Sequence, residues 1–402
     1  MRSIKIISTL FLAALLFHFQ NAYAQEDSEK NGYEFTMIKE LDATSVKNQY
    51  RTGTCWSFSA ISLLESEMMR KGKDAVNLSE MWIVRHTYSE KAEKYVRFHG
   101  NLNFSPGGAF HDVTNMIDKH GIVPESVYPG MEYGTEKHNH GEMDAVLKGY
   151  VDQVIENENG ELSPVWHEGF TDILETYLGE KPETFTYEGE EYTPESFAED
   201  CVDLDPDNYL ELSSYTHHPF YSRFILEVPD NWSYDRVYNL PIDELMEVMY
   251  YSIESGYSIA WAADVSDRGF SWNNGLAVVP AKDLEDMTDT ERARWEELTE
   301  AGKQQQLYNF NEPGKEKEIT QKMRQKAFNN YNTTDDHGMH ITGLAEDQNG
   351  TKYFYVKNSW SDNNHIYDGY LYASDAYVRY KTMDIMVHKD AIPEDIAEKL
   401  GL

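Results

Sequence analysis

Hydrophobic side chains recur with helical spacing between residues 55 and 72. Ala60, Leu64 and Met68 follow one another at intervals of four, which places them on one face of an α-helix. A stripe of this kind indicates a helix whose apolar face is buried. We therefore expect a largely buried helix that begins at Cys55.

Two further helices are expected in the first third of the chain. One follows Leu78-Ser79-Glu80, and the other runs from Ala109 to about Lys119. Between them, residues 103–108 read Asn-Phe-Ser-Pro-Gly-Gly. Such residues permit positive φ and close approach of the backbone, so this segment is expected to be a loop.

The hydrophobic period changes near the C-terminal end. Between residues 337 and 372 apolar and polar residues alternate as they do in β-strands, and residues 347–350, Asp-Gln-Asn-Gly, are typical of a turn. This pattern predicts a β-hairpin. The hairpin carries His337 on one strand and Asn358 near the end of the other.

The middle of the chain, residues 131–330, is more acidic and less regular than either end. It contains acidic runs such as Glu188-Gly189-Glu190-Glu191 and a charged helical stretch from about 289 to 306. No internal repeat of fixed period is visible in the sequence. We interpret residues 131–330 as containing a large acidic insertion that forms an accessory region.

The N-terminal segment has the pattern of a secretory signal. Residues 1–5 are short and basic, residues 6–19 are apolar, and Ala22-Tyr23-Ala24 places small residues where a signal peptidase cuts. We expect residues 1–24 to be a signal peptide that is cleaved before Gln25. The apolar run is short for a membrane span, and no later stretch approaches the roughly 18 apolar residues that a span needs. The mature protein is thus expected to be periplasmic or secreted, without a membrane span.

The chain is strongly acidic. Its formal net charge is -35, and loss of Arg2 and Lys5 with the signal peptide takes that charge to -37. A field of this sign repels phosphate backbones and anionic lipid head groups. We therefore expect no nucleic-acid partner and no binding to anionic membrane surfaces.

The two cysteines, Cys55 and Cys201, could form a disulfide in an exported protein. Cys201 lies among acidic neighbours in residues 199–203, which raise rather than lower a thiol pKa, so we interpret it as a structural residue. Cys55 instead stands at the start of an expected buried helix, where a thiol can serve as a nucleophile. These surroundings argue against a disulfide between Cys55 and Cys201.

Cys55 is a candidate nucleophile because it is expected at the N-terminus of a helix. A thiol attacks a carbonyl as the thiolate, and a helix N-terminus or a cationic imidazole lowers its pKa. His337 is the candidate base, and Asn358 can accept a hydrogen bond from its other ring nitrogen. Gln49, six residues before Cys55, can place its side-chain amide beside the Cys55 backbone N–H. The two N–H groups together would stabilise an oxyanion.

Two histidine clusters raise the question of a metal site. They are His138-Asn139-His140 and His217-His218, and neither has His-Glu-x-x-His spacing or a neighbouring cysteine pair. We interpret both clusters as solvated loop histidines. Neither a metal nor another cofactor is expected.

Three segments resemble those of papain-like cysteine peptidases. Residues 48–58, Asn-Gln-Tyr-Arg-Thr-Gly-Thr-Cys-Trp-Ser-Phe, resemble the Gln…Gly-x-Cys-Trp-x-Phe segment of that superfamily. Residues 337–343, His-Gly-Met-His-Ile-Thr-Gly, and 356–361, Val-Lys-Asn-Ser-Trp-Ser, are similar to its histidine and asparagine segments. On an alternating strand His337 and His340 face opposite sides, and this register selects His337 as the base.

Within this superfamily the chain resembles the branch of bleomycin hydrolase and bacterial aminopeptidase C. Gly107-Gly108 followed by residues 120–124, His-Gly-Ile-Val-Pro, is similar to a pattern of this branch, as is Asp264 in an Ala-Ala-Asp-Val strand. The 282 positions from Cys55 to His337 also exceed the roughly 130–150 of the papain and cathepsin pattern. That surplus favours the same branch.

The resemblance implies an α+β, two-lobed papain-like fold for residues 25–402, with a cleft between a helical lobe and a β-rich lobe. It implies a cysteine peptidase that hydrolyses peptides through an acyl-enzyme on Cys55. Gly107 and Gly108 would line a groove for the substrate backbone. Trp360 is a further substrate-binding candidate, since its indole can cover the imidazole and exclude water.

The mode of cleavage stays open at this point. Members of the branch are typically hexamers, so a homo-oligomer is one expectation. Their C-terminal arm restricts them to aminopeptidase action, whereas this chain ends at residues 398–402, soon after the last strand pattern. Aminopeptidase-like action is therefore expected, with endopeptidase action in an open cleft as the alternative. Peptide binding by an inactive module and acyl transfer to an amine acceptor also stay open.

Overall fold

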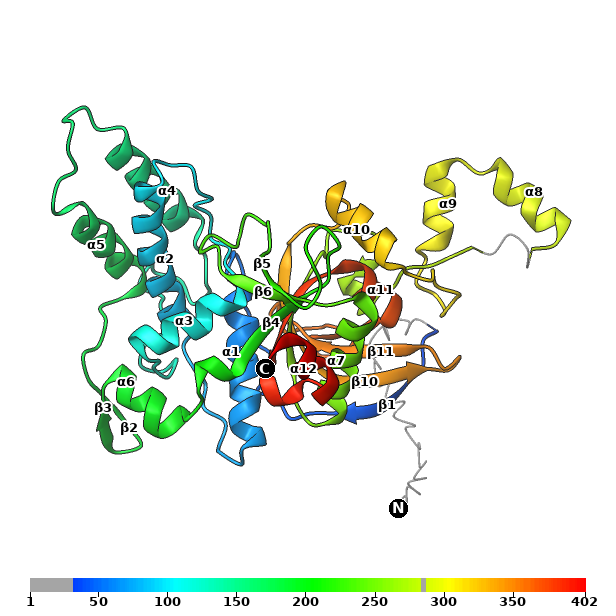
Figure 1. Cartoon of the computed structure of the whole chain (residues 1–402), viewed down its shortest axis with the longest axis horizontal. Coiled ribbons are helices and arrows are strands. Elements are labelled where there is room, and N and C mark those ends of the chain that lie inside the picture. Colours follow the sequence, from blue (N-terminus) through cyan, green and yellow to red (C-terminus); the bar gives the residue numbers. More distant parts are fainter. Residues whose placement is uncertain (1–31, 283–286) are drawn as a thin grey trace, which may run out of the picture. The chain divides into compact units, whose positions relative to one another are not determined.

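The computed structural model describes residues 32–282 and 287–402, which form one unit with helices at one end and a large sheet at the other (Figure 1). The expected signal peptide, residues 1–24, lies outside the described residues. In the part of the chain that is described, no helix is long and apolar enough to cross a membrane.

The helical lobe confirms the helices that the hydrophobic spacing predicted. Helix α1 begins at Cys55, as expected, and is buried along most of its length. Helix α2 is capped by Ser79, whose hydroxyl accepts a hydrogen bond from the Trp82 backbone N–H at 3.0 Å. The lobe consists of α1 (Cys55–Arg70), α2 (Glu80–Arg97), α3 (Phe110–His120), α4 (Gly141–Ile155) and α5 (Trp166–Leu178), whose apolar faces share one core.

The β-rich lobe is built on one mixed sheet. Its strands are β1 (Phe35–Glu40), β4 (Tyr209–Ser213), β5 (Arg223–Ile225), β6 (Arg236–Asn239), β7 (Ile259–Ala263), β8 (Phe270–Ser271), β9 (Leu276–Ala277), β10 (His337–Asp347), β11 (Lys352–Lys357), β12 (Tyr370–Ser374) and β13 (Thr382–His388). The order across the sheet is β5-β6-β4-β13-β7-β10-β11-β12-β9-β8, and β1 also pairs with β10. The first residue of β10 therefore lies in the interior of the sheet, beside β7.

The predicted hairpin is present as β10 and β11. The strands pair antiparallel, with Ile341 opposite Val356, and Gly350 turns between them with φ +80°. His337 is the first residue of β10 and Asn358 directly follows β11. The pairing thus brings the two residues to the same end of the hairpin.

Residues 131–330 do not form one separate accessory lobe, contrary to our interpretation. Their first part supplies α4 and α5 to the helical lobe, followed by a small hairpin, β2 (Phe185–Tyr187) with β3 (Glu190–Tyr192), and α6 (Pro194–Phe197). Their later part supplies β4 to β9 to the main sheet, where β7 pairs with both β10 and β13. Strand β7 reads Ile-Ala-Trp-Ala-Ala, and an apolar run of this kind has no alternation that identifies a strand.

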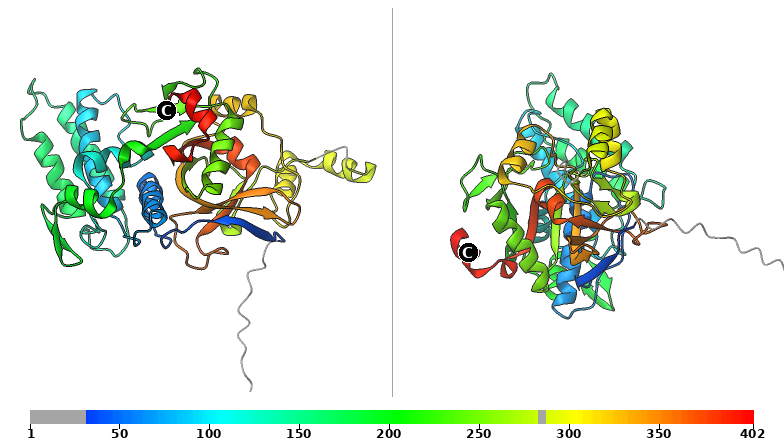
Figure 2. Two further views of the ribbon diagram at one scale, coloured as in Figure 1. Left: turned by 60° about the horizontal axis from the view of Figure 1, so that its bottom comes forward. Right: turned by 90° about the vertical axis from the view of Figure 1, so that its right-hand side faces the viewer.

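The charged stretch predicted as one helix from about 289 to 306 is two helices. Helix α8 (Asp289–Glu297) ends where Leu298 is extended, and Thr299 caps α9 (Glu300–Leu307) by accepting from the Gly302 backbone N–H at 3.2 Å. Figure 2 shows this pair, in yellow, at the end of the sheet that is remote from the helical lobe. The pair therefore lies away from Cys55.

The outer layer of the β-rich lobe holds the C-terminal residues. Helices α7 (Ile242–Glu254), α10 (Gln321–Asn329) and α11 (Asp375–Lys381) pack beside the sheet, followed by α12 (Glu394–Leu400). Ile396 of α12 is fully buried, and the Lys399 Nζ lies 3.2 Å from the Glu244 Oε1 of α7. The last described residues thus pack against α7 (Figure 1).

Candidate active site

Cys55 is the first residue of α1, where the helix leaves backbone N–H groups without partners. The Trp56 and Gly338 backbone N–H groups both donate to its sulfur. Gly338 permits this approach because a Cβ there would lie 2.7 Å from the Ser59 Oγ of α1. The start of β10 is therefore pressed against the first turn of α1, with the thiol between them.

The geometry at Asn358 fixes the tautomer of His337. The Asn358 Oδ1 accepts from the Ser359 backbone N–H at 2.8 Å, which identifies that atom as the oxygen. The same oxygen lies 2.7 Å from the His337 Nε2, so this nitrogen must carry the proton. The Nδ1 of the neutral ring therefore holds a lone pair and can act as a base.

Trp360 packs on the imidazole, as predicted. The ring centroids of Trp360 and His337 are 4.5 Å apart at an interplanar angle of 31°, and Trp272 packs edge-on against the same indole. His337 is only 4% exposed. The indole thus keeps water from one side of the imidazole; its expected contact with substrate stays a prediction.

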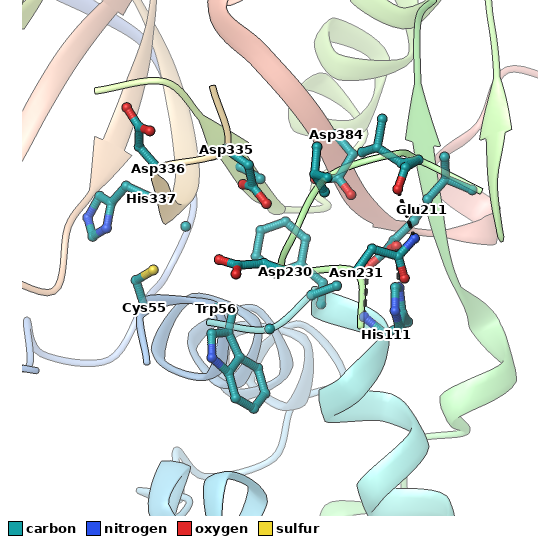
Figure 3. Close-up of a pocket in the computed structure, with 18 residues that line it drawn as sticks. Cys55, Trp56, His111, Glu211, Asp230, Asn231, Asp335, Asp336, His337 and Asp384 are labelled. Carbon is teal, nitrogen blue, oxygen red and sulfur yellow. Dashed lines mark hydrogen bonds and ion pairs between the residues drawn. The ribbon is translucent and has the colours of Figure 1, made fainter. Parts of the chain in front are cut away.

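Cys55 and His337 line one pocket, and Figure 3 shows them next to each other at its edge. Burial raises the pKa of the Cys55 thiol to about 12 and lowers the pKa of His337 to about 4. Both shifts penalise the charged forms, so they favour the neutral thiol and imidazole. From the sequence we expected a lowered thiol pKa; burial reverses that sign, although the two backbone amides at the sulfur act in the expected direction.

Proton transfer within the pair is less costly than ionising the two groups separately, because the opposite charges attract each other. Moving the proton from the Cys55 Sγ to the His337 Nδ1 creates two opposite charges side by side, so the pair stays neutral overall. The imidazolium then keeps its hydrogen bond to Asn358. The arrangement can therefore generate a thiolate at the moment of attack.

Gln49 lies beside the asparagine segment. Its Oε1 accepts from the Ser359 Oγ at 2.6 Å, and its Nε2 donates to the Thr52 carbonyl at 2.9 Å. These contacts occupy one of the two Nε2 hydrogens. The second Nε2 hydrogen is available to donate to an oxyanion. That Gln49 stabilises the oxyanion in the reaction stays a prediction.

The two glycines of the expected groove differ in their surroundings. Gly108 lines the pocket beside Cys55, and a Cβ there would lie 2.8 Å from the Trp56 ring. Gly107 does not face an open groove, since a Cβ on it would collide with the Asp230 carboxylate. Asp230 lies between β5 and β6, in a segment that the sequence did not connect with the cleft.

His340 is held away from the thiol, as predicted. Its Nδ1 lies 2.9 Å from the Ser62 Oγ, two helical turns along α1 from Cys55, and Lys357 donates to that same hydroxyl at 2.8 Å. The arrangement is consistent with a structural role for His340.

The remaining histidine clusters and the second cysteine are clear of the site. His138 and His140 are buried rather than solvated, which corrects our interpretation. His217 and His218 each lie within hydrogen-bonding distance of the Glu227 carboxylate, at 2.9 and 2.6 Å. Cys201 lies in the π-helical turn Ala198–Val202, and both cysteines are free thiols.

A group of acidic residues in the pocket was not predicted from the sequence. These are Glu211, Asp230, Asp335, Asp336 and Asp384 (Figure 3). They come from β4, the β5–β6 connection, the segment before β10, and β13. The only local signal was the position of two of them directly before His337.

Comparison with known proteins identifies relatives along most of the chain. The Peptidase C1-like family matches residues 13–303 and 299–401. Aminopeptidase G of Lactobacillus delbrueckii subsp. lactis is 22% identical over 409 residues, which cover 90% of this chain and 85% of the relative. Aminopeptidase C of the same organism is 22% identical over 422 residues, with 93% and 86% covered.

A solved structure agrees with the observed fold. The crystal structure of PepW from Lactobacillus rhamnosis superimposes with a TM-score of 0.66 at 19% identity, over 91% of this chain and 84% of that chain. The α+β, two-lobed papain-like fold that the resemblance implied is thereby confirmed.

The reactivity of Cys55 should depend on His337. In His337→Ala, burial and the charges of Asp335 and Asp230 still raise the thiol pKa against the two amides, which confines the thiolate to high pH. Alkylation of Cys55 by iodoacetamide at about pH 7 should fall at least tenfold and rise with pH up to about pH 9. Mass spectrometric peptide mapping measures the labelled fraction.

Cys201 in the same digests is the internal control, because it has no imidazole partner and its labelling rate should not change. Equal Cys55 labelling rates in the wild-type protein and His337→Ala would contradict the pairing.

Proposed function

The chain belongs to the Peptidase C1-like family of cysteine-type peptidases, and on that premise we propose that it removes N-terminal residues from peptides through an acyl-enzyme on Cys55. The observation that carries the proposal is the imidazole of His337. Its proton is fixed on Nε2 by Asn358, which leaves Nδ1 as a base beside a thiol at a helix N-terminus.

The proposed reaction proceeds in two halves. The His337 Nδ1 takes the thiol proton, and the Cys55 sulfur attacks the scissile carbonyl carbon. The Cys55 backbone N–H and the second Gln49 Nε2–H donate to the oxyanion. The tetrahedral intermediate collapses to a thioester while His337 protonates the leaving amine. His337 then deprotonates a water, which attacks the thioester and releases the acid with recovery of the thiol.

Aminopeptidase action is the preferred mode because the relatives that match along most of the chain are named aminopeptidases. Endopeptidase action is the second candidate. It is favoured by one observation: residues 389–402, which pack against α7, contribute nothing to the lining of the pocket beside Cys55. Peptides are the substrates in either case, and assembly into a homo-oligomer stays a prediction.

Digestion of matched peptides separates these modes. The purified protein is incubated under reducing conditions with peptides whose N-termini are free or acetylated, and the products are identified by mass spectrometry. Stepwise loss of residues from the free peptides alone is expected. Internal cuts in both sets would instead mean an endopeptidase, and no cleavage of any peptide would favour a peptide-binding module.

Cysteine variants supply the matched control for this digestion. Cys55→Ala should lower kcat by on the order of 10⁴-fold or more, because it removes the nucleophile. Cys201→Ala should retain activity. Peptidase activity that survives in Cys55→Ala would refute the assignment of the nucleophile.

We also propose that the protein is exported, on the basis of the sequence pattern in residues 1–24. Removal of that segment should leave Gln25 as the first residue of the mature chain. N-terminal sequencing of the protein isolated from its producing cells measures this directly. A chain that retains Met1 at its N-terminus would contradict export by this route.

A further inference from the structure

The pocket beside Cys55 has an unbalanced charge. Five acidic side chains line it, together with two imidazoles. Burial lowers the pKa of His337 to about 4, so His111 is the only cationic side chain among the lining residues. Figure 3 shows Asp230, Asp335, Asp384 and Glu211 to the right of Cys55 and His337, with Asp336 above His337.

His111 is already committed to one of these carboxylates. Its backbone N–H and its Nδ1 both lie 2.7 Å from the Glu211 oxygens, and its Nε2 lies 2.8 Å from the Ser233 Oγ. Against the effect of burial, the Glu211 carboxylate raises the pKa of His111 to about 10. The imidazolium therefore pairs with Glu211, whereas none of the other four acids forms an ion pair within the described residues.

Asp384 is the most deeply buried of these acids. It is 6% exposed, it lines the pocket from β13, and no hydrogen bond or ion pair is formed by its carboxylate within the described residues. Arg324 lies nearby, but its guanidinium donates to the carbonyls of Ser214, Arg379 and Met383 instead. Burial, Glu211 and Asp335 raise the pKa of Asp384 well above its usual range. A buried carboxylate without a partner costs free energy, which a bound cation would recover.

Two further carboxylates face the same space. Asp335 is half-buried and, within the described part of the chain, has no hydrogen-bond partner; burial and then Asp230 raise its pKa to about 8. Asp230 accepts from the Asn103 Nδ2 and the Ser105 Oγ, each at 3.2 Å, through one oxygen only. Asp336, by contrast, accepts from the Ser266 backbone N–H and the Thr334 hydroxyl. Asp230, Asp335 and Asp384 are therefore the acids that a bound cation would favour in their ionised form.

We propose that this pocket is a specificity subsite for a positively charged group of the peptide substrate, bound by Asp384, Asp335 and Asp230. The proposal rests on the proposed peptidase function, because it assigns the substrate class of the same site. The group is an ammonium or a guanidinium. It belongs either to a Lys or Arg side chain or to the free N-terminus of the peptide.

The lining of the pocket favours an organic cation over a metal ion. Leu226, Val228 and Val237 form apolar walls, which suit the methylene stem of a Lys or Arg side chain. Among the described residues, three metal-type ligand atoms within 4.8 Å of one another occur at His217, His218 and Glu227, and not in this pocket. No three carboxylate oxygens of this pocket therefore lie close enough together to hold one small metal ion. Their separation instead suits a cation carried on a longer side chain.

The test compares peptides that differ only in charge. In each pair, lysine is matched with norleucine or arginine with citrulline at a position on the N-terminal side of the scissile bond. Every peptide is prepared with a free and with an acetylated N-terminus. We expect kcat/KM to be at least about tenfold higher for the cationic member of a pair. A preference for the cationic member among the free peptides assigns the pocket to the side chain. Equal kcat/KM within each pair, together with binding to Cys55→Ala that is lost on acetylation, assigns it to the α-ammonium.

Asp384→Asn and Asp335→Asn should each reduce this preference, the ratio of kcat/KM for the cationic peptide to that for its neutral partner, at least about threefold. Asp118→Asn is the matched control, because Asp118 is exposed on α3 and the substitution makes the same change in net charge. Asp335 is half-buried, so its variant remains informative if Asp384→Asn fails to fold. An undiminished preference in the folded variants would overturn the proposal.

A binding measurement separates this proposal from the proposed function. Calorimetry with Cys55→Ala measures the affinity for the lysine and norleucine peptides without any turnover. If Cys55→Ala binds the lysine peptide preferentially but the wild-type protein hydrolyses no peptide, the subsite is supported and the peptidase function is refuted. Hydrolysis by the wild-type protein, with affinities for Cys55→Ala that change neither between lysine and norleucine nor on acetylation of the N-terminus, would refute the subsite and support the peptidase alone.

Discussion

The close packing of Gly338 on the first turn of α1 is the contact on which the site depends. The thiol belongs to the helical lobe and the imidazole to the β-rich lobe, so neither lobe alone holds a reactive pair. Because residue 338 has no side chain, β10 can approach until its backbone N–H reaches the Cys55 sulfur. The neighbouring residue, His337, is then placed on the pocket that Cys55 lines. The junction of the lobes is therefore what creates the chemistry.

Burial has two opposed effects at this junction. It excludes water, through Trp360 and the surrounding sheet, and so strengthens every interaction with charge that develops in the reaction. It also penalises the thiolate and the imidazolium when each is considered alone. Pairing the two groups resolves the conflict, because proton transfer between them leaves the pair neutral. Asp230, Asp335 and Asp384, on the far side of the pocket, form no ion pair within the described residues, which is the basis of the proposed cationic subsite.

The sequence predicted the parts of the structure that local pattern determines. Helix α1 and the β10–β11 hairpin follow from the spacing of apolar residues and a turn signal, and the pairing of His337 with Asn358 follows from the hairpin. The role of β7 was not predictable, since its apolar run has no alternation and its partners are distant in sequence. The acids of the pocket were missed for the same reason: they come from several elements that only the fold brings together. The sign of the Cys55 pKa shift was missed because burial of the pair cannot be read from a motif.

The measurement that tests the central claim most directly is the mass of the protein quenched in acid during turnover of a peptide ester, whose acyl-enzyme forms faster than it hydrolyses. A mass increase equal to the acyl part of the ester is expected, located on Cys55 by peptide mapping, removed by hydroxylamine and absent in His337→Ala. Turnover of the ester without an adduct on Cys55, or with the adduct on Cys201, would contradict this mechanism.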